Sequence, residues 1–84
     1  MGRTIPTMRQ SVEELSTRIE RMGRLMNKDE MELLIKLILK GRKHAHEASY
    51  SSLDPEFSFA LSVLIEMEKE IHVIRERLES LERE

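Results

Sequence analysis

Histidine and glutamate side chains gather in the segment GRKHAHEASY, residues 41–50, where metal binding or acid–base chemistry would first be sought. His44 and His46 are two residues apart. On a helix such residues point about 200° away from each other, so they cannot share a metal ion there, although they could on a strand. His44 and Glu47 are three apart and could meet on one helix face. The segment is therefore interpreted mainly as the end of a helix, and not as a metal site or an acid–base pair.

A second group of possible ligands, Glu68, His72 and Glu76, follows at four-residue steps. A carboxylate-bridged di-iron bundle needs glutamates from two helices plus two Glu-x-x-His pairs, and the chain supplies no such set. We therefore expect no metal and no cofactor, and interpret the histidines as residues of solvated helix surfaces. His44 lies beside small residues and could cap a carbonyl of a neighbouring helix.

No arrangement of a nucleophile and a base is recognisable, so we expect no catalytic residue. The serines fall in predicted caps and in a predicted interhelical loop, where Ser stabilises the backbone, and no glycine-rich phosphate loop is present. The sequence favours a protein that is not an enzyme. One catalytic alternative stays open, a small dimeric helical enzyme whose site lies between chains and is built from Arg and Glu.

Basic side chains form two rows, one near residues 18–24 and one near residues 40–43. Near helix ends they oppose the negative end of the helix dipole, and Arg18, Arg21 and Arg24 could also pair with glutamates of the last helix. Alternatively, they form a phosphate-binding surface that follows a nucleic-acid backbone. One tyrosine and no tryptophan weigh against that alternative. The candidate polar surface comprises Arg3, Arg9, Arg18, Arg21, Arg24, Arg42, Lys43 and His44.

The elements that must position these side chains are three helices, predicted over residues 11–26, 28–49 and 54–82. Ser11 with Glu14, and Asn27 with Glu30, have the spacing of capping boxes. Asp54 before Pro55 is typical of a helix start. Residues 1–10 are predicted to be an extended N-terminal arm, and residues 11–84 one helical domain. Short connections predict an all-α, up-down-up three-helix bundle with a long C-terminal helix.

Apolar residues of the last two helices predict self-association. The stretch LLIKLIL, residues 33–39, is apolar nearly all round, which favours more than one packing partner. The last helix carries a heptad pattern with charged flanks, as in a coiled coil. We expect a homodimer whose interface draws on Met31, Leu34, Leu37, Ile38, Leu39, Gly41, Ala45, Ala48, Ile71, Ile74, Leu78 and Leu81.

Length and charge agree with self-association. A chain of 84 residues buries only about 60% of its unfolded surface, and without cysteine it lacks disulfides. The net charge is −2, with segment charges of +2, +1 and −5 over residues 1–27, 28–50 and 51–84. A basic front and an acidic tail attract each other, within one chain or between two. No apolar run is long enough to span a membrane, which predicts a cytoplasmic protein.

Two short motifs, RTIPTMR at residues 3–9 and RKHAHEAS at residues 42–49, resemble a family of small uncharacterised archaeal proteins. Its members open with an Arg-Thr-Ile-Pro arm, carry an Arg-x-His-Ala motif and end in a long glutamate-rich helix. The resemblance implies no activity. It implies an archaeal cytoplasmic protein whose arm folds over the end of the second helix. The positions that match are Arg3, Thr4, Pro6, Arg9, Arg42, His44, Ala45, Ala48 and Ser49.

These observations together predict a helical interaction module, either a homodimer or a subunit of a larger complex with a protein partner. The alternatives are the nucleic-acid-associated protein and the small helical enzyme described above.

Overall fold

The computed structural model describes residues 7–83, and within them the chain forms four helices and no strand. The helices are α1 (Met8–Gly23), α2 (Lys28–Arg42), α3 (Ala45–Ala48) and α4 (Pro55–Arg83). The predicted all-α class and the long C-terminal helix are confirmed. Most of the predicted arm, residues 1–6, lies outside the described residues, whereas residues 8–10 belong to α1.

Side-chain caps explain where the helices begin. Asn27 accepts a hydrogen bond from the backbone N–H of Glu30, whose carboxylate accepts one from the N–H of Asn27, so this predicted capping box is confirmed. The predicted box at Ser11 is wrong. Thr7 caps α1 instead, together with the side chain of Gln10, and α1 therefore starts three residues earlier than expected. Pro55 occupies the first position of α4, as predicted.

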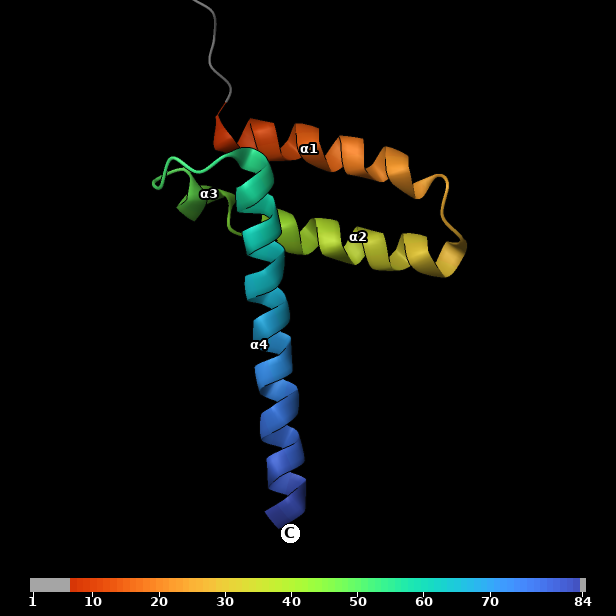
Figure 1. Cartoon of the computed structure of the whole chain (residues 1–84), viewed down its shortest axis with the longest axis vertical. Helices are drawn as coiled ribbons and strands as arrows, with labels where there is room; N and C mark the ends of the chain where they lie inside the picture. Colours follow the sequence, from red (N-terminus) through yellow and green to blue (C-terminus); the bar gives the residue numbers. More distant parts are fainter. Residues whose placement is uncertain (1–6, 84) are drawn as a thin grey trace, which may run out of the picture.

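The first two helices form an antiparallel hairpin whose facing sides hold a small core (Figure 1). Apolar residues recurring at three- and four-residue steps give each helix one buried face. Gly23, at the end of α1, leaves room for the side chains of Met31 and Leu34 on α2. The buried hydrophobic residues are Val12, Leu34, Ile38, Ala45 and Phe59.

The long helix α4 crosses the hairpin instead of returning along it (Figure 1). Its first turns contact α2 and α1, and its remaining length projects from the hairpin. Helices α2 and α4 cross at Gly41 of α2. There the ring of Phe59 from α4 occupies the space that a Cβ at Gly41 would need. The close approach predicted at Gly41 is therefore present, although the third long helix runs in a different direction from the one expected of an up-down-up bundle.

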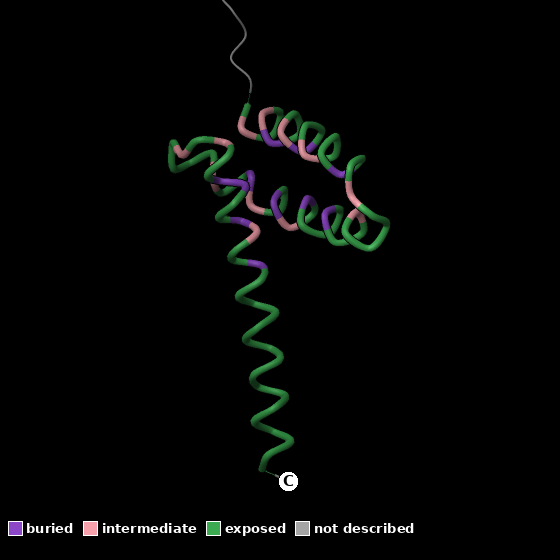
Figure 2. The backbone as a smooth tube through the Cα atoms, turned by 45° about the vertical axis from the view of Figure 1, so that its right-hand side comes forward, coloured by how far each residue is buried: buried purple, intermediate pink, exposed green. Residues whose placement is uncertain are grey.

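The result is a flat, elongated molecule. Its principal extents are 67 × 34 × 13 Å, and an α-helix with its side chains is about 10–12 Å across. Buried residues lie along both helices of the hairpin and on the first turns of α4, and every residue from 67 to 83 is exposed (Figure 2). More than half of α4, residues 67–83, is thus exposed.

Candidate functional site

A corner between α2 and α4 is fixed by the hydroxyl of Ser62. This hydroxyl donates to the carbonyl of Lys40 over 2.6 Å and accepts the backbone N–H of His44 over 3.2 Å. Ser62 is 1% exposed, so both bonds are shielded from water. The serine satisfies backbone groups left open where α2 ends, and for that reason α2 stops at Arg42 and not near residue 49 as predicted.

His44 lies between two carboxylates at this corner. Its Nδ1 is 2.6 Å from Oε2 of Glu47, and its Nε2 is 2.7 Å from Oε2 of Glu66. The predicted meeting of His44 with Glu47 is confirmed, whereas Glu66 was not foreseen. Glu66 also accepts hydrogen bonds from Lys43 over 3.0 Å and from Lys69 over 3.1 Å. One carboxylate of α4, 9% exposed, therefore holds three positively charged or protonatable groups.

The charges of the corner stabilise one another. The hydrogen bond with Glu47, followed by the one with Glu66, raises the pKa of His44 above its ordinary 6.5, although partial burial opposes the shift. The hydrogen bond with His44, followed by those with Lys43 and Lys69, lowers the pKa of Glu66 to about 2. The His44 hydrogen bond likewise lowers the pKa of Glu47. The favoured state is a protonated imidazole that donates to two ionised carboxylates.

This arrangement suits a structural clamp better than a catalytic centre. In the protonated imidazole both ring nitrogens are donors, so no lone pair is available to accept a proton from a nucleophile. His46 points elsewhere, with its ring 5.4 Å from that of Tyr50 in an edge-on contact. His72 pairs with Glu76 at 3.1 Å, far along α4. Within residues 7–83, no group of three potential ligands is placed to hold a metal ion.

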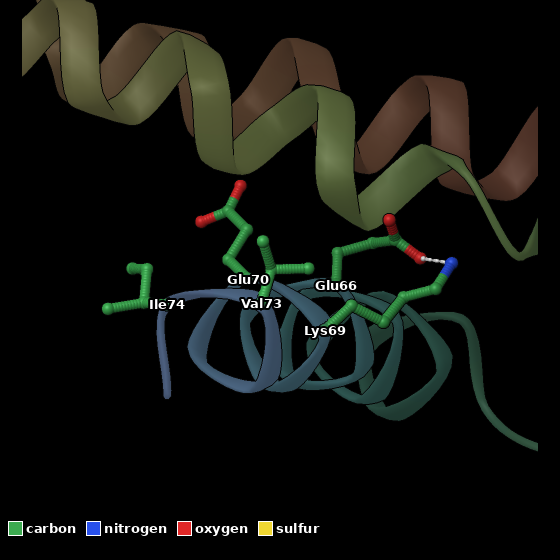
Figure 3. A pocket seen from close by; sticks show the side chains of 5 residues that line it. All are labelled: Glu66, Lys69, Glu70, Val73 and Ile74. Carbon is green, nitrogen blue, oxygen red and sulfur yellow. Dashed lines mark hydrogen bonds and ion pairs between the residues drawn. The ribbon is translucent and has the colours of Figure 1, made fainter. Parts of the chain in front are cut away.

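Beside the clamp, an open hollow of about 380 Å³ lies in the angle between α2 and α4. Figure 3 shows its lining, with Glu66, Glu70 and Val73 extending from α4 toward α2 and Lys69 joined to Glu66. Glu70 also forms an ion pair with Lys40 of α2 at 3.1 Å. Two ion pairs, Lys43 with Glu66 and Lys40 with Glu70, thus connect α2 to α4. Together they hold α4 at the angle at which it projects from the hairpin.

A continuous apolar stripe runs along α4, separate from the residues buried against the hairpin, and one of its members, Ile74, also lines the hollow just described (Figure 3). The residues of α4 buried against the hairpin are Ser58, Phe59, Ser62 and Glu66. The stripe residues fall on other helical positions and all are exposed. They recur at alternating three- and four-residue steps, as Phe57, Ala60, Leu64, Met67, Ile71, Ile74, Leu78 and Leu81.

The residues predicted to form a dimer interface divide into two groups. Four of them, Leu34, Ile38, Gly41 and Ala45, are buried inside the chain against α1 and α4, so the prediction that they face a partner is wrong. Met31 and Ala48 are partly buried. The others remain exposed and accessible to a partner, namely Leu37, Leu39, Ile71, Ile74, Leu78 and Leu81.

The predicted polar surface is only partly assembled. Arg9, Arg42 and Lys43 line one hollow of about 670 Å³ between the start of α1 and the ends of α2 and α3, together with His46 and one acid, Glu13. Arg42 forms an ion pair with Glu13 across it. This hollow joins residues of the two motifs quoted above, including Ala45 and Ser49.

The remaining basic residues do not join that hollow. Arg18 and Arg21 are exposed on the later turns of α1 and Arg24 directly follows that helix, and none of the ion pairs within residues 7–83 involves them. The expectation that they pair with glutamates of the last helix is therefore wrong, since Lys40 and Lys43 of α2 fill that role. His44 belongs to the clamp, and Arg3 lies outside the described residues.

Ser62, Glu66 and Phe59 were missed by sequence reasoning. Each occupies a position of α4 outside the heptad stripe, where a polar or single aromatic residue looks like ordinary solvated surface. Only the direction of the crossing brings them to the end of α2. One signal was present, because a glycine inside α2 predicts a large side chain packed against it.

Comparison with known proteins identifies the family of the chain without assigning an activity. The model of a domain of unknown function, DUF8156, matches residues 1–84. The chain belongs to the DUF8156 family. The resemblance to an uncharacterised family is thereby confirmed in its general form. No curated protein and no solved structure gives a significant match to this DUF8156 chain. None of its helices within residues 7–83 combines the length and apolar character needed to cross a membrane.

Proposed function

We propose that this DUF8156 chain is a non-enzymatic helical interaction module that forms a homodimer through the apolar stripe of α4. The observation that carries the proposal is the continuous exposure of the stripe from Phe57 to Leu81. These residues span about 36 Å of helix, or three and a half heptads, which is long enough for a coiled coil. The resemblance noted above suggests that this module works in the cytoplasm of an archaeal cell.

The physical argument is the cost of leaving the stripe in water. Burying a large aliphatic side chain contributes about 1.5–3 kcal/mol to stability. The stripe holds six such side chains that are exposed in the single chain, namely Leu64, Met67, Ile71, Ile74, Leu78 and Leu81. Pairing with a second helix buries them without rearranging the hairpin, because the residues of α4 buried against the hairpin lie outside the stripe. A chain of this size also gains from association, since it buries too little surface alone.

A second copy is the partner that the chain itself favours. The heptad flanks of α4 carry both signs of charge, so the helix can be complementary to itself. Catalysis has less support, because the histidine–carboxylate cluster at the corner is engaged in holding that corner.

The test is the oligomeric state of two matched variants, measured by light scattering after size-exclusion chromatography. Ile74→Glu places a charge on the stripe, whereas Val73→Glu makes the same chemical change at the next residue, outside it. Ile74 is 56% exposed and Val73 is 44% exposed, so neither change disturbs a folded core. We expect Ile74→Glu to shift the protein to monomer and Val73→Glu to leave it dimeric. Equal masses for the two variants would contradict the proposal.

A second candidate function has one observation in its favour, the basic hollow between α1, α2 and α3. Arg9, Arg42 and Lys43 line this hollow, although Arg42 also pairs with Glu13 and Lys43 with Glu66. The guanidinium groups of Arg9 and Arg42 are suited to bind phosphate oxygens in pairs. We propose phosphate of a nucleic-acid backbone as the ligand of this hollow. Binding of a single-stranded oligonucleotide should weaken as salt rises and should weaken further in Arg9→Ala, with the exposed Arg18→Ala as control. Binding that is absent at low salt, or equally affected by both variants, would exclude this function.

A further inference from the structure

We infer that two copies of the chain pair their α4 helices in parallel and in register, which places both hairpins at the same end of the dimer. This inference rests on the proposed function, because it names the orientation of the partner that the stripe of α4 binds. The stripe residues define the two core positions of the heptad repeat. Phe57, Leu64, Ile71 and Leu78 occupy the first core position, a, and Ala60, Met67, Ile74 and Leu81 occupy the second, d.

Parallel pairing in register uses the whole stripe. Each of the eight residues then faces the identical residue of the second copy, and all of them are exposed and available in the single chain. The residues buried against the hairpin lie at other heptad positions, so two copies can approach along the entire stripe without displacing either hairpin.

Charges beside the core favour this orientation. Two heptad positions flank the core, namely e, which follows d, and g, which precedes a. In a parallel pair, a g residue of one copy lies near the e residue five positions further along the second copy. Glu70 then lies near Arg75 of the second copy, and Arg77 lies near Glu82. Both contacts join opposite charges, and the two-fold symmetry repeats each of them. Glu70 is 62% exposed at its side chain, so it can keep Lys40 of its own chain as a second partner.

The antiparallel arrangement that buries the whole stripe is penalised. It sets Phe57 opposite Leu81 of the second copy, and in that register g residues face g residues and e residues face e residues. Glu70 then faces Glu70, and Glu68 faces Glu68, so like charges meet at the centre of the coil.

Shifting the antiparallel pair by one heptad restores opposite charges but sacrifices apolar contact. Glu70 then meets Arg77, and Glu68 meets Arg75. In that register Phe57 and Ala60 have no partner among the eight stripe residues, so two stripe residues of each copy stay outside the pairing of the stripe. Parallel pairing is the arrangement that satisfies all the core residues and the flanking charges together.

The orientation has a consequence for what the dimer can bind. Because each hairpin packs on residues of α4 outside the stripe, a parallel dimer carries two hairpins at one end, related by the two-fold axis. Each hairpin brings its own basic hollow, so a partner with two-fold symmetry could contact both. An antiparallel dimer would instead place the hairpins at opposite ends.

Single-cysteine variants test the orientation directly, because the chain contains no cysteine. A disulfide requires Cα atoms about 4.4–6.8 Å apart. The Leu81→Cys protein should form a disulfide-linked dimer on mild oxidation, since parallel pairing brings the two copies of position 81 together. A mixture of Phe57→Cys and Leu81→Cys should yield linked dimers of each variant with itself and almost none that join the two. His72→Cys, on the outer side of the coil, serves as the control for random collision and should stay unlinked.

The outcomes separate this inference from the proposed function. If the mixture links Phe57→Cys to Leu81→Cys while Leu81→Cys alone stays unlinked, the dimer is antiparallel and the inference is overturned, whereas the proposed function stands. If no variant links above the level of His72→Cys although the unoxidised protein is dimeric, the stripe is not the interface, and both fail. A monomeric unoxidised wild type removes the proposed function itself. The two-stranded arrangement would be overturned by a disulfide-linked product larger than a dimer. It would also be overturned if the protein under reducing conditions had a mass in solution above twice 9.9 kDa.

Discussion

Replacing Gly41 with alanine tests the crossing of α2 and α4, on which the position of the corner depends. A Cβ at this position would overlap three carbons of the Phe59 ring. Phe59 is buried, and its rigid ring has no flexible end that could move aside. The overlap should cost about 3 kcal/mol, the upper end for overpacked cores. The gain in helix propensity from Gly to Ala returns about 1 kcal/mol, so we expect a net loss of about 2 kcal/mol.

The assay is thermal unfolding followed by circular dichroism at one fixed protein concentration. For a domain of this size, a loss of 2 kcal/mol lowers Tm by about 8–16 °C. Gly23→Ala is the matched control. Its Cβ would meet the thioether of Met31 and one methyl of Leu34, which are ends of flexible side chains, and the change should cost less than about 1 kcal/mol.

A double variant shows whether the ring is the cause. With Phe59→Leu in the background, the penalty of Gly41→Ala should fall by at least about 1 kcal/mol, because contacting residues are coupled. A Gly41→Ala protein that melts at or above the wild-type temperature would refute the close approach. The same conclusion would follow if the penalty were unchanged in the Phe59→Leu background.

Three further predictions concern the corner and the caps. The pH dependence of stability, followed by urea unfolding, should show a maximum between about pH 4.5 and 6.5. Because the pKa of His44 is raised, its protonation stabilises the fold fully below pH 6.5, and this contribution is lost as pH rises through the raised pKa. Because the pKa of Glu66 is lowered, its ionisation stabilises the fold fully above pH 4.5, and this contribution is lost as pH falls toward about 2. A profile that is unchanged in His44→Gln would show that this clamp does not control it. Ser62→Ala should cost about 1–3 kcal/mol in the same assay, since it leaves the carbonyl of Lys40 buried without its donor, and a cost below 0.5 kcal/mol would argue against that bond. Asn27→Ala should cost about 1 kcal/mol through loss of the α2 cap, and wild-type stability would count against the cap.

Local rules predicted the elements but not all of their ends. The cap at Asn27 obeyed its rule because nothing nearby competes with it. At the start of α1 two sites fit the same rule, Ser11 with Glu14 and Thr7 with Gln10, and the residues alone do not decide between them. The chain uses the earlier pair, which adds a turn to α1 and places Met8 against the core.

The corner depended on tertiary structure, which periodicity does not encode. Residues 43–48 are all compatible with a continuous helix, so only the bonds from Ser62 at the end of α2 explain the break. Glu66 is 22 positions from His44 along the chain, and their contact depends on the angle at which α4 crosses. Four of the twelve residues assigned to a dimer interface were apolar for a different reason, because they pack inside the chain.

The central claim is that the stripe of α4 joins two copies of the chain. Sedimentation equilibrium of the unmodified protein, over a concentration range from about one to one hundred micromolar, measures this most directly. The account predicts a species of twice 9.9 kDa that dissociates only on dilution, with the helix content of α4 retained. A single species of 9.9 kDa across the range, with the same helix content, would contradict it.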